Sequence, residues 1–430
     1  MRQQLGIGFI CLAALTGCMQ ATGDAVTPSP EVTRAAGQPP QSFAEAGASE
    51  IIGTLQSRSS VIPSGSSYAR IAQAVLAANA RPAEADLRAA RLRSQAASKN
   101  WLPQLGPSIT LTSLSSVAAG ILVQQVVFDN GRRKAERAFA AADVEAVAVT
   151  LSTDTNARVL TGLTLFLKAE QAREAAHVSA RAADRMRYFQ GIMGERVDGG
   201  VSDISDLRVV ATKLKEAENR AVSDREDASV ALAELAAMSD RSLSDVRGLV
   251  SLATPPQGVK PLGVLSAEAI RTRDIAQANM ERADMLPGAS ISGSLGEGQR
   301  TQLSIDTAQL IGAGTGASLA AVQAAKDAAD RRVAQSKEDA NRLLRRLSQQ
   351  LTALDRQEGE ARALAKSAWA NQDVFQEQFE AGARPILDVI GNYETAMRLE
   401  RDAVRIKYDR ARVRLEIANV FGALVDGEDI

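Results

Sequence analysis

The sequence has 430 residues and a net charge of −1 at pH 7, and aromatic residues make up only 3% of it. A chain of this charge has no overall field that would recruit nucleic acid, and it has no lysine- and arginine-rich run interleaved with aromatics, so we exclude nucleic acid as a partner. The scarcity of aromatic residues beside abundant alanine, leucine and charged residues favours long helices over one large globular core.

The first 17 residues have the layout of a secretory signal peptide. Arg2 is followed by the apolar stretch LGIGFICLAAL, which is too short to span a membrane. The stretch ends in Leu15-Thr16-Gly17-Cys18, the spacing of a lipobox, so we expect a covalent lipid with palmitate on Cys18; ordinary cleavage nearby is the alternative. Such a lipid would tether the chain to a membrane, and we expect no other cofactor.

The rest of the chain divides into an irregular segment and two repeats. Residues 18–65 are rich in proline, glycine, serine and alanine without a hydrophobic period, which predicts a lipidated, irregular tether. From residue 66 the order helix, extended pair, very long helix, break and helix occurs twice. We assign repeat 1 to 66–253, a linker to 254–264, repeat 2 to 265–425 and a tail to 426–430.

Each repeat contains a pair of segments that break the helical period, at about 105–128 and about 287–310. Each segment is about 8–11 residues, the length of a tilted strand across a bilayer. Ile109 and Leu111 share one face of such a strand, with Thr110 on the other. Four strands cannot close a membrane barrel, and lipid does not tolerate open edges, so several chains would have to share one barrel.

The helices of each repeat have matching lengths. A helix over 133–193 would have about 60 residues and a length of about 90 Å, and helices over 66–99 and 204–238 are each about half as long. Stacked end to end, the two shorter helices could pair with the long one. In repeat 2 the corresponding segments are 316–381, 266–283 and 386–424.

Coiled-coil seams are expected in the last two helices. Spacings of three and four link apolar residues from Leu344 to Gly382, with polar lapses that include Glu358 and Gln372. A second seam links Leu399, Ala403, Ile406, Arg410, Val413, Ile417, Val420 and Leu424. Many seam residues are alanine, so neighbouring helices are needed on more than one side.

The helical pattern is interrupted at two tips, about 194–204 and about 381–386. Gly200 and Asp206 precede Gly382 and Asp388 by the same 182 residues. Glycine suits a reversal because it enters positive φ without penalty, and Pro385 suits the first turn of the following helix.

The duplicated order, the lipobox and three short segments together resemble the outer-membrane efflux proteins of the TolC type. The segments are NWLPQLGPSITLTS (100–113), VVFDNGRRKAE (126–136) and FEAGARPILDV (379–389). The resemblance covers about residues 66–425 and implies a homotrimer. It implies a mainly α fold with a small β part, in which duplicated long helices form a periplasmic α-barrel and four strands per chain contribute transmembrane β-strands to one shared β-barrel.

The resemblance also implies roles for residues of the tips. An acid lines the closed entrance and an arginine ties neighbouring helices together, which correspond to Asp388 and Arg384. Their repeat-1 partners correspond to Ser205 and Asp206. The sequence departs from the family pattern at two positions: Phe379 stands where a hydrogen-bonding tyrosine can occur, and Gly391 stands where a second ring of acids can occur.

Alternative interpretations stay open for these residues. Asp206 and Asp388 follow helix breaks, where acids favour the helix dipole without any pore. Arg384 is either a tip-lock residue or a solvated loop residue. Trp101 and Phe128 lie at the ends of the first hairpin, as membrane-interface residues or, for Trp101, as a packing residue at a helix end.

The sequence offers no catalytic or metal-binding constellation. His177 is the only histidine, on a long helix among alanine, glutamate and arginine, which favours an exposed surface position. The stretch GAGTG at 312–316 lacks the Lys-Ser/Thr that completes a phosphate-binding loop. We therefore expect a protein that is not an enzyme.

Together these features predict a lipid-anchored outer-membrane exit duct for a tripartite efflux pump or a type I secretion system. Such a duct is a passive trimeric channel gated at its periplasmic tip, with a periplasmic adaptor protein and an inner-membrane transporter as partners. The alternative is a non-conducting periplasmic coiled-coil lipoprotein that acts as an envelope scaffold. The hairpins discriminate between the two, because a scaffold needs no strands of membrane length.

Overall fold

The computed structural model describes residues 49–429, apart from 80–81, 114–115, 240, 254–257, 297–299 and 307–311. Repeat 1 contains α2 (Ser67–Ala77), α3 (Pro82–Ser98), β1 (Gln104–Ser113), β2 (Ser116–Phe128), α4 (Arg132–Asp198) and α5 (Ile204–Ala237). Repeat 2 contains α6 (Leu262–Asp284), β3 (Gly288–Gly296), β4 (Arg300–Asp306), α7 (Thr315–Glu380) and α8 (Ile386–Val420). Helix α1 (Glu50–Gln56) precedes both repeats, and the short helix η1 (Gly427–Asp429) follows them.

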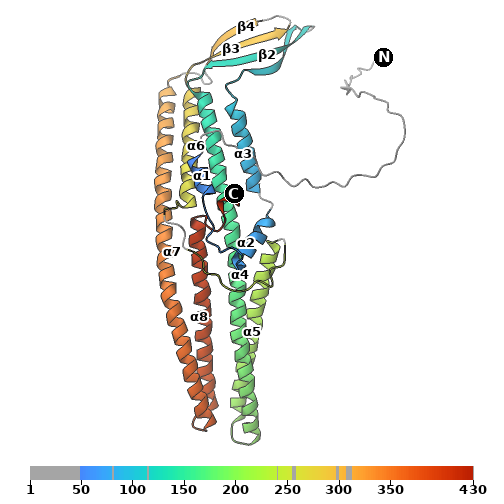
Figure 1. Ribbon diagram of the computed structural model, residues 1–430, viewed down its shortest axis with the longest axis vertical. Coiled ribbons are helices and arrows are strands. Elements are labelled where there is room, and N and C mark those ends of the chain that lie inside the picture. The colour runs from blue at the N-terminus through green and yellow to red at the C-terminus, as the bar shows by residue number, and fades with distance from the viewer. Residues whose placement is uncertain are drawn as a thin grey trace, which may run out of the picture. The chain divides into compact units, whose positions relative to one another are not determined.

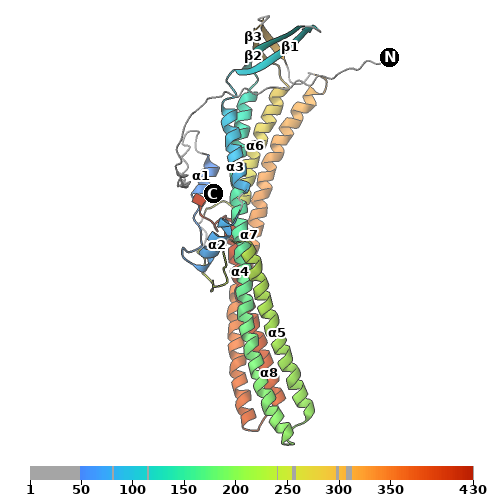
Figure 2. The ribbon, with the colours of Figure 1, turned by 90° about the vertical axis from the view of Figure 1, so that its right-hand side faces the viewer.

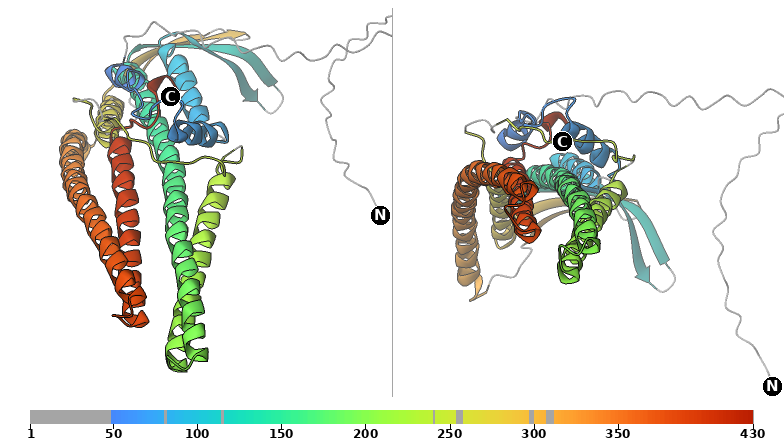
Figure 3. Two further views of the ribbon diagram at one scale, coloured as in Figure 1. Left: turned by 60° about the horizontal axis from the view of Figure 1, so that its bottom comes forward. Right: turned by 90° about the horizontal axis from the view of Figure 1, so that it is seen from below.

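The fold is mainly helical, with one long helix in each repeat. Helices α4 and α7 have 67 and 66 residues. Helices α3 and α5 pack along α4, and α6 and α8 pack along α7, while α4 also contacts α6 and α8 and so joins the repeats. Figure 1 shows the strands at one end of these helices and the two helix–helix turns at the other. Figure 3 shows the pairs α4–α5 and α7–α8 side by side.

The prediction of one helix over 66–99 is wrong, because two helices occupy this range. Helix α2 ends at its C-cap, Ala78, and α3 begins at Pro82. Proline lacks the N–H that a continuing helix needs, but it is well suited to a first helical position. The chain therefore restarts its helix at Pro82.

One four-stranded antiparallel sheet has the order β1-β2-β3-β4. The central pairing of β2 with β3 joins the hairpins of the two repeats, for example with Gln124 opposite Ser292. Strands β1 and β4 form the outer edges of the sheet and pair on one side only within the described chain. The two hairpins thus form one continuous surface with two open edges.

The seam predicted in α7 is confirmed. Glu358, Ala365, Gln372 and Phe379 are buried at intervals of seven residues. The two polar lapses have partners there: Glu358 pairs with Arg410 of α8 at 2.6 Å, and Gln372 accepts a hydrogen bond from Asn392 at 3.2 Å. Buried polar groups therefore interrupt the seam without losing their partners.

The seam predicted in α8 is wrong as the main buried stripe, because most of its residues are only half-buried. The buried stripe of α8 includes Tyr393, Met397, Val404, Tyr408 and Leu415. This stripe faces α4, where the Tyr408 hydroxyl donates to Glu174 at 2.9 Å and the Tyr393 hydroxyl donates to the Arg181 carbonyl at 3.3 Å. The larger side chains of α8 thus serve the contact between repeats.

The prediction of an irregular tether up to residue 65 is also wrong for its last part. Helix α1 buries Leu55, and Arg58 is only 8% exposed. The Arg58 guanidinium donates to the carbonyls of Phe421 and of Lys260, the latter at 2.8 Å, and burial lowers its pKa to about 10. Val61 N donates to the Ala423 carbonyl at 2.8 Å. Figure 2 shows α1, α2 and the C-terminus on the same flank of the long helices.

Candidate functional site

The sheet has two chemically different faces. Alternation places Leu105 and Ile109 of β1 on the same face as Ile121 and Val123 of β2. The opposite face carries polar residues: Gln104, Gln124, Ser290, Ser292, Gln302 and Ser304. Leu105 and Ile109 are each 72% exposed. An exposed apolar face backed by a polar face is the pattern of strands that separate lipid from an aqueous interior.

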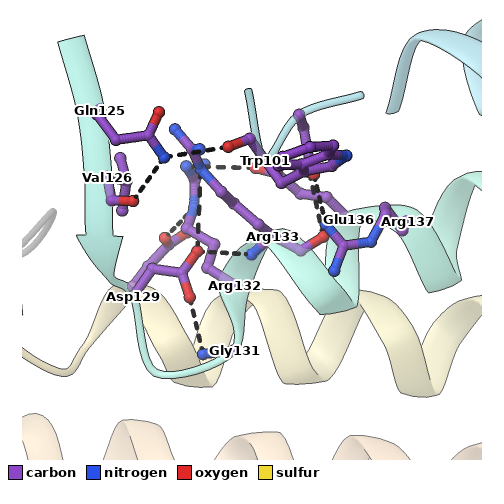
Figure 4. A network of polar contacts seen from close by, with 11 residues as sticks. Trp101, Gln125, Val126, Asp129, Gly131, Arg132, Arg133, Glu136 and Arg137 are labelled. Atoms are coloured by element: carbon purple, nitrogen blue, oxygen red, sulfur yellow. Dashed lines mark hydrogen bonds and ion pairs between the residues drawn. The ribbon is translucent and has the colours of Figure 1, made fainter. Parts of the chain in front are cut away.

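A polar network anchors the first hairpin to the helices (Figure 4). The Asp129 carboxylate accepts hydrogen bonds from Gly131 N and Arg133 N, each at 3.0 Å, and so caps α4. Asn100 donates to the Glu136 carboxylate at 2.8 Å and accepts from Arg137 at 2.6 Å. The network fixes the direction in which the strands leave the helices.

The same turn also binds the start of the second hairpin. Asn130 adopts a positive φ of 52° and donates its side-chain amide to the Pro287 carbonyl at 2.8 Å. Arg132 pairs with Asp284 at the end of α6 at 2.5 Å. Sequence reasoning missed this role; the signal was the Asp-Asn-Gly turn chemistry within the segment at 126–136. This turn therefore holds the two hairpins together within one chain.

Trp101 and Phe128 lie at the helix-facing end of the sheet. Their exposed fractions are 61% and 57%, and Gln125 donates to the Trp101 carbonyl at 3.0 Å. Such exposure argues against a role as buried packing residues. Their placement at a membrane interface stays a prediction.

The repeat-2 tip is a tight turn with an ordered arginine. Gly382 has a φ of 75°, and Pro385 is the N-cap of α8 rather than a residue of its first turn. The Arg384 guanidinium lies 3.9 Å over the Phe375 ring and donates to the Gln378 side chain at 2.8 Å. It also lies 3.5 Å from the Asp388 carboxylate. Arg384 is therefore held in place rather than freely solvated.

The repeat-1 tip has a similar turn but a different cap. Gly200 has a φ of 71°, and the Asp203 carboxylate accepts a hydrogen bond from Ser205 N at 2.7 Å. This hydrogen bond holds the pKa of Asp203 below its ordinary value. Ser205 is exposed and Asp206 is half-buried in the first turn of α5. Sequence reasoning missed Asp203, although an acid just before a helix is a standard capping signal.

The structure separates some of the residues that we grouped in the tip lock. Within the chain, Arg384 contacts its own hairpin and has no printed bond to Ser205 or Asp206, so their pairing stays a prediction. Phe379 is 8% exposed and belongs to the hydrophobic cluster of the tips, with the Arg196 guanidinium 5.8 Å from its ring. Gly391 is exposed. Phe379 thus connects the two tips by packing.

A buried ion pair links three helices midway along the described helices. Arg401 of α8 donates to the Asp224 carboxylate of α5 at 2.8 Å, and Ser179 of α4 donates to the same carboxylate at 2.7 Å. Asp224 is 7% exposed and Ser179 is fully buried. No sequence motif indicated this site, because its members are separated by up to 222 residues. Cys18 lies outside the described residues, so the structure leaves its lipidation untested.

None of the described helices has a stretch that is long and apolar enough to cross a membrane. No family model matches the chain, and no curated protein matches it. The comparison with solved structures gives a different result: the chain has the fold of outer-membrane channels of the TolC type.

Three solved structures illustrate this similarity. A membrane protein from Pseudomonas aeruginosa is 17% identical with a TM-score of 0.74, over 86% of this chain and 92% of that one. CusC, whose structures concern transmembrane channel formation, is 13% identical with a TM-score of 0.74, over 82% and 91%. The open state of the Neisseria gonorrhoeae MtrE outer membrane channel is 15% identical with a TM-score of 0.68, over 87% and 89%. At these identities the likeness shows the fold.

Proposed function

We propose that the chain is one subunit of a trimeric outer-membrane exit duct, anchored by a lipid on Cys18 and gated at its periplasmic tips. The observation that carries the proposal is the four-stranded sheet with one apolar and one polar face and two open edges. Open edges are excluded from lipid, and three chains of four strands give an even-numbered closed barrel. The fold shared with outer-membrane channels supports the same conclusion.

The position of the ordered N-terminus supports the lipid anchor. Residues 19–48 have a contour of about 100 Å when extended. Helix α1 packs near Val149 of α4, about 17 residues and therefore about 26 Å along the helix from Arg132 beneath the sheet. The tether is thus long enough to place Cys18 at the same membrane as the strands.

The duct would carry out no chemistry of its own. Energy for export would come from an inner-membrane transporter, reached through a periplasmic adaptor protein at the helical tips, in an efflux pump or a type I secretion system. The apolar side chains exposed near the repeat-1 tip, Val201 at 69% and Ile204 at 50%, are compatible with a docking partner there.

Cross-linking and conductance together test the proposal. The mature chain, extracted from outer-membrane fractions in mild detergent and treated with an amine-reactive cross-linker, should give a covalent trimer, and the same material should form channels in planar bilayers. A monomer or dimer would contradict the duct. A trimer that never conducts, with strands inaccessible to lipid, would favour the envelope scaffold instead.

A further inference from the structure

Helix α3 carries a basic face just below the sheet. Arg88, Arg91 and Lys99 are exposed, and at 100° per residue they project within about 80° of one another, on the side away from the buried Leu87 and Ala90. None of the three has an ion-pair or hydrogen-bond partner for its side chain among the described residues. No acidic residue occurs between Arg88 and Asn100. We call Arg88, Arg91 and Lys99 the basic face.

The second repeat provides a comparison within the same chain. Asn100 and Asp284 occupy equivalent places before the two hairpins, 184 residues apart. The same offset sets the basic face against Thr272, Ile275 and Ala283 of α6. A duplicated helix with the same packing role therefore does without these charges, so helix packing does not require them.

The exposed apolar residues of the same segment point to a membrane surface. Leu92 lies on the basic face and is 59% exposed, and Trp101 follows Lys99 after one residue and is 61% exposed. Lys134, in the first turn of α4, is exposed and also has no side-chain partner in the described part of the chain. Basic residues combined with exposed leucine and tryptophan are typical of segments that lie at the headgroup level.

Distances along the helix fit this placement. Lys99 lies at the end of α3, and Arg91 and Arg88 lie about 12 Å and about 16 Å further along the helix. Arginine side chains extend toward an interface, and the field of a charged surface decays over about 10 Å. Lys99 and Arg91 thus come within reach of headgroup charges, with Arg88 at the margin.

We propose that the basic face binds the phosphates of anionic phospholipids in the membrane leaflet beneath the sheet. The inference rests on the proposed function, because it needs the sheet to lie in a membrane. Each basic residue close to an anionic surface contributes about fivefold to binding at low ionic strength. Each subunit thereby gathers anionic lipid beside its first hairpin and leaves the second hairpin without this preference.

Tryptophan fluorescence provides a direct test, because the chain has two tryptophans and Trp369 lies far along α7. The full-length Trp369→Phe protein is reconstituted in phosphatidylcholine vesicles with a minority of phosphatidylglycerol. Bromine is placed on the acyl chains of one lipid or the other at equal mole fraction. We expect bromines on phosphatidylglycerol to quench Trp101 at least twofold more strongly, with the preference lost in high salt.

A matched pair of triple variants assigns the effect to the basic face. Arg88→Gln, Arg91→Gln and Lys99→Gln together should remove the preference. The control changes Arg345, Arg346 and Lys366, which are exposed on α7, to glutamine and should retain it. Circular dichroism checks that both variants are folded.

The outcomes separate this inference from the proposed function. Equal quenching by both brominated lipids in the parent protein, or a preference that the triple variant retains, would overturn the basic face as a lipid site while leaving the duct intact. No quenching by either lipid would place Trp101 outside the membrane and contradict the duct itself. A triple variant with altered ion selectivity and unchanged lipid preference would assign the basic face to the aqueous interior.

Discussion

Asp224 carries a charge into a seam that otherwise consists of small apolar side chains. Its neighbours along the buried stripe of α5 are Ala217, Ala221, Ala228 and Ala231. Burial alone would raise the pKa of Asp224, but the hydrogen bonds and charge from Arg401 and the hydrogen bond from Ser179 outweigh burial and hold this pKa below its ordinary value. A carboxyl whose pKa is lowered by folding stabilises the fold above its unfolded-state pKa of about 4.

Replacing Asp224 tests this contribution. Asp224→Ala leaves the partly buried Arg401 without its partner and should cost about 3 kcal/mol of stability at pH 7. The difference from the parent should shrink as the pH falls below about 4, because protonation of Asp224 removes the same contribution from the parent. Thermal unfolding followed by circular dichroism over a pH series measures both effects.

The control for this prediction is Asp227→Ala, an exposed acid one turn further along α5. It should change stability by less than about 0.5 kcal/mol. If the two variants are equally stable at pH 7, Asp224 is not an important link between the helices.

Among the structural elements, the repeat-2 tip holds opposite charges within one helical turn. Arg384 and Asp388 are 31% and 52% exposed, and their charged groups lie 3.5 Å apart. A pair this exposed contributes little to stability, about 0–1 kcal/mol. Its electrostatic effect on a nearby ion path is larger, since the arginine partly neutralises the acid.

Two tip variants should change a conducting trimer in opposite directions. Asp388→Ala removes the acid and should lower cation selectivity and weaken block by divalent cations. Arg384→Ser frees the carboxylate and should raise cation selectivity, and it should also raise resting conductance, because Arg384 orders the turn through Phe375 and Gln378. Planar-bilayer recordings measure selectivity and open probability separately.

Arg345→Ser on the exposed side of α7 is the control and should behave like the parent protein. Parent-like selectivity, block and resting current in both tip variants would mean that the Gly382–Asp388 segment is only a turn before a helix.

Sequence patterns predicted the elements whose signal is local and missed the contacts that depend on distant residues. The strands and the tip turns follow from alternation and from Gly200 and Gly382, whose φ angles are positive. The main buried stripe of α8 was missed because this helix packs on α4 as well as on α7, and spacing alone does not say which neighbour receives the larger side chains. The Asp224–Arg401 pair was missed because its members lie 177 residues apart.

Across the whole molecule, the duplicated repeats share a fold but divide the tasks at the membrane unequally. The Asp-Asn-Gly turn and the basic face occur only in repeat 1, whereas the corresponding stretch of repeat 2 includes Gly312, Gly314 and Gly316. The lipidation site also precedes repeat 1. A lipid on Cys18 is therefore an additional anchor, and the barrel is built elsewhere in the chain.

The anchor and the assembly should be separable. Cys18→Ala should abolish labelling by radioactive palmitate while cross-linked trimers persist, because the strands and helix seams are unchanged. Cys11→Ala, within the signal peptide, is the control and should leave labelling intact. Palmitate incorporation that persists in Cys18→Ala would refute the lipidation site.

The contact between the two ends of the chain also determines when folding can finish. Arg58 and Phe421 are joined by a hydrogen bond across 363 residues of sequence, and Val61 pairs with Ala423. Residues exported first must therefore wait for those exported last before the cluster around Tyr68, Phe166 and Leu415 can close. Contacts of such long range form slowly, and the waiting segment exposes apolar surface in the meantime. The nascent chain thus depends on protection from aggregation until its final residues arrive.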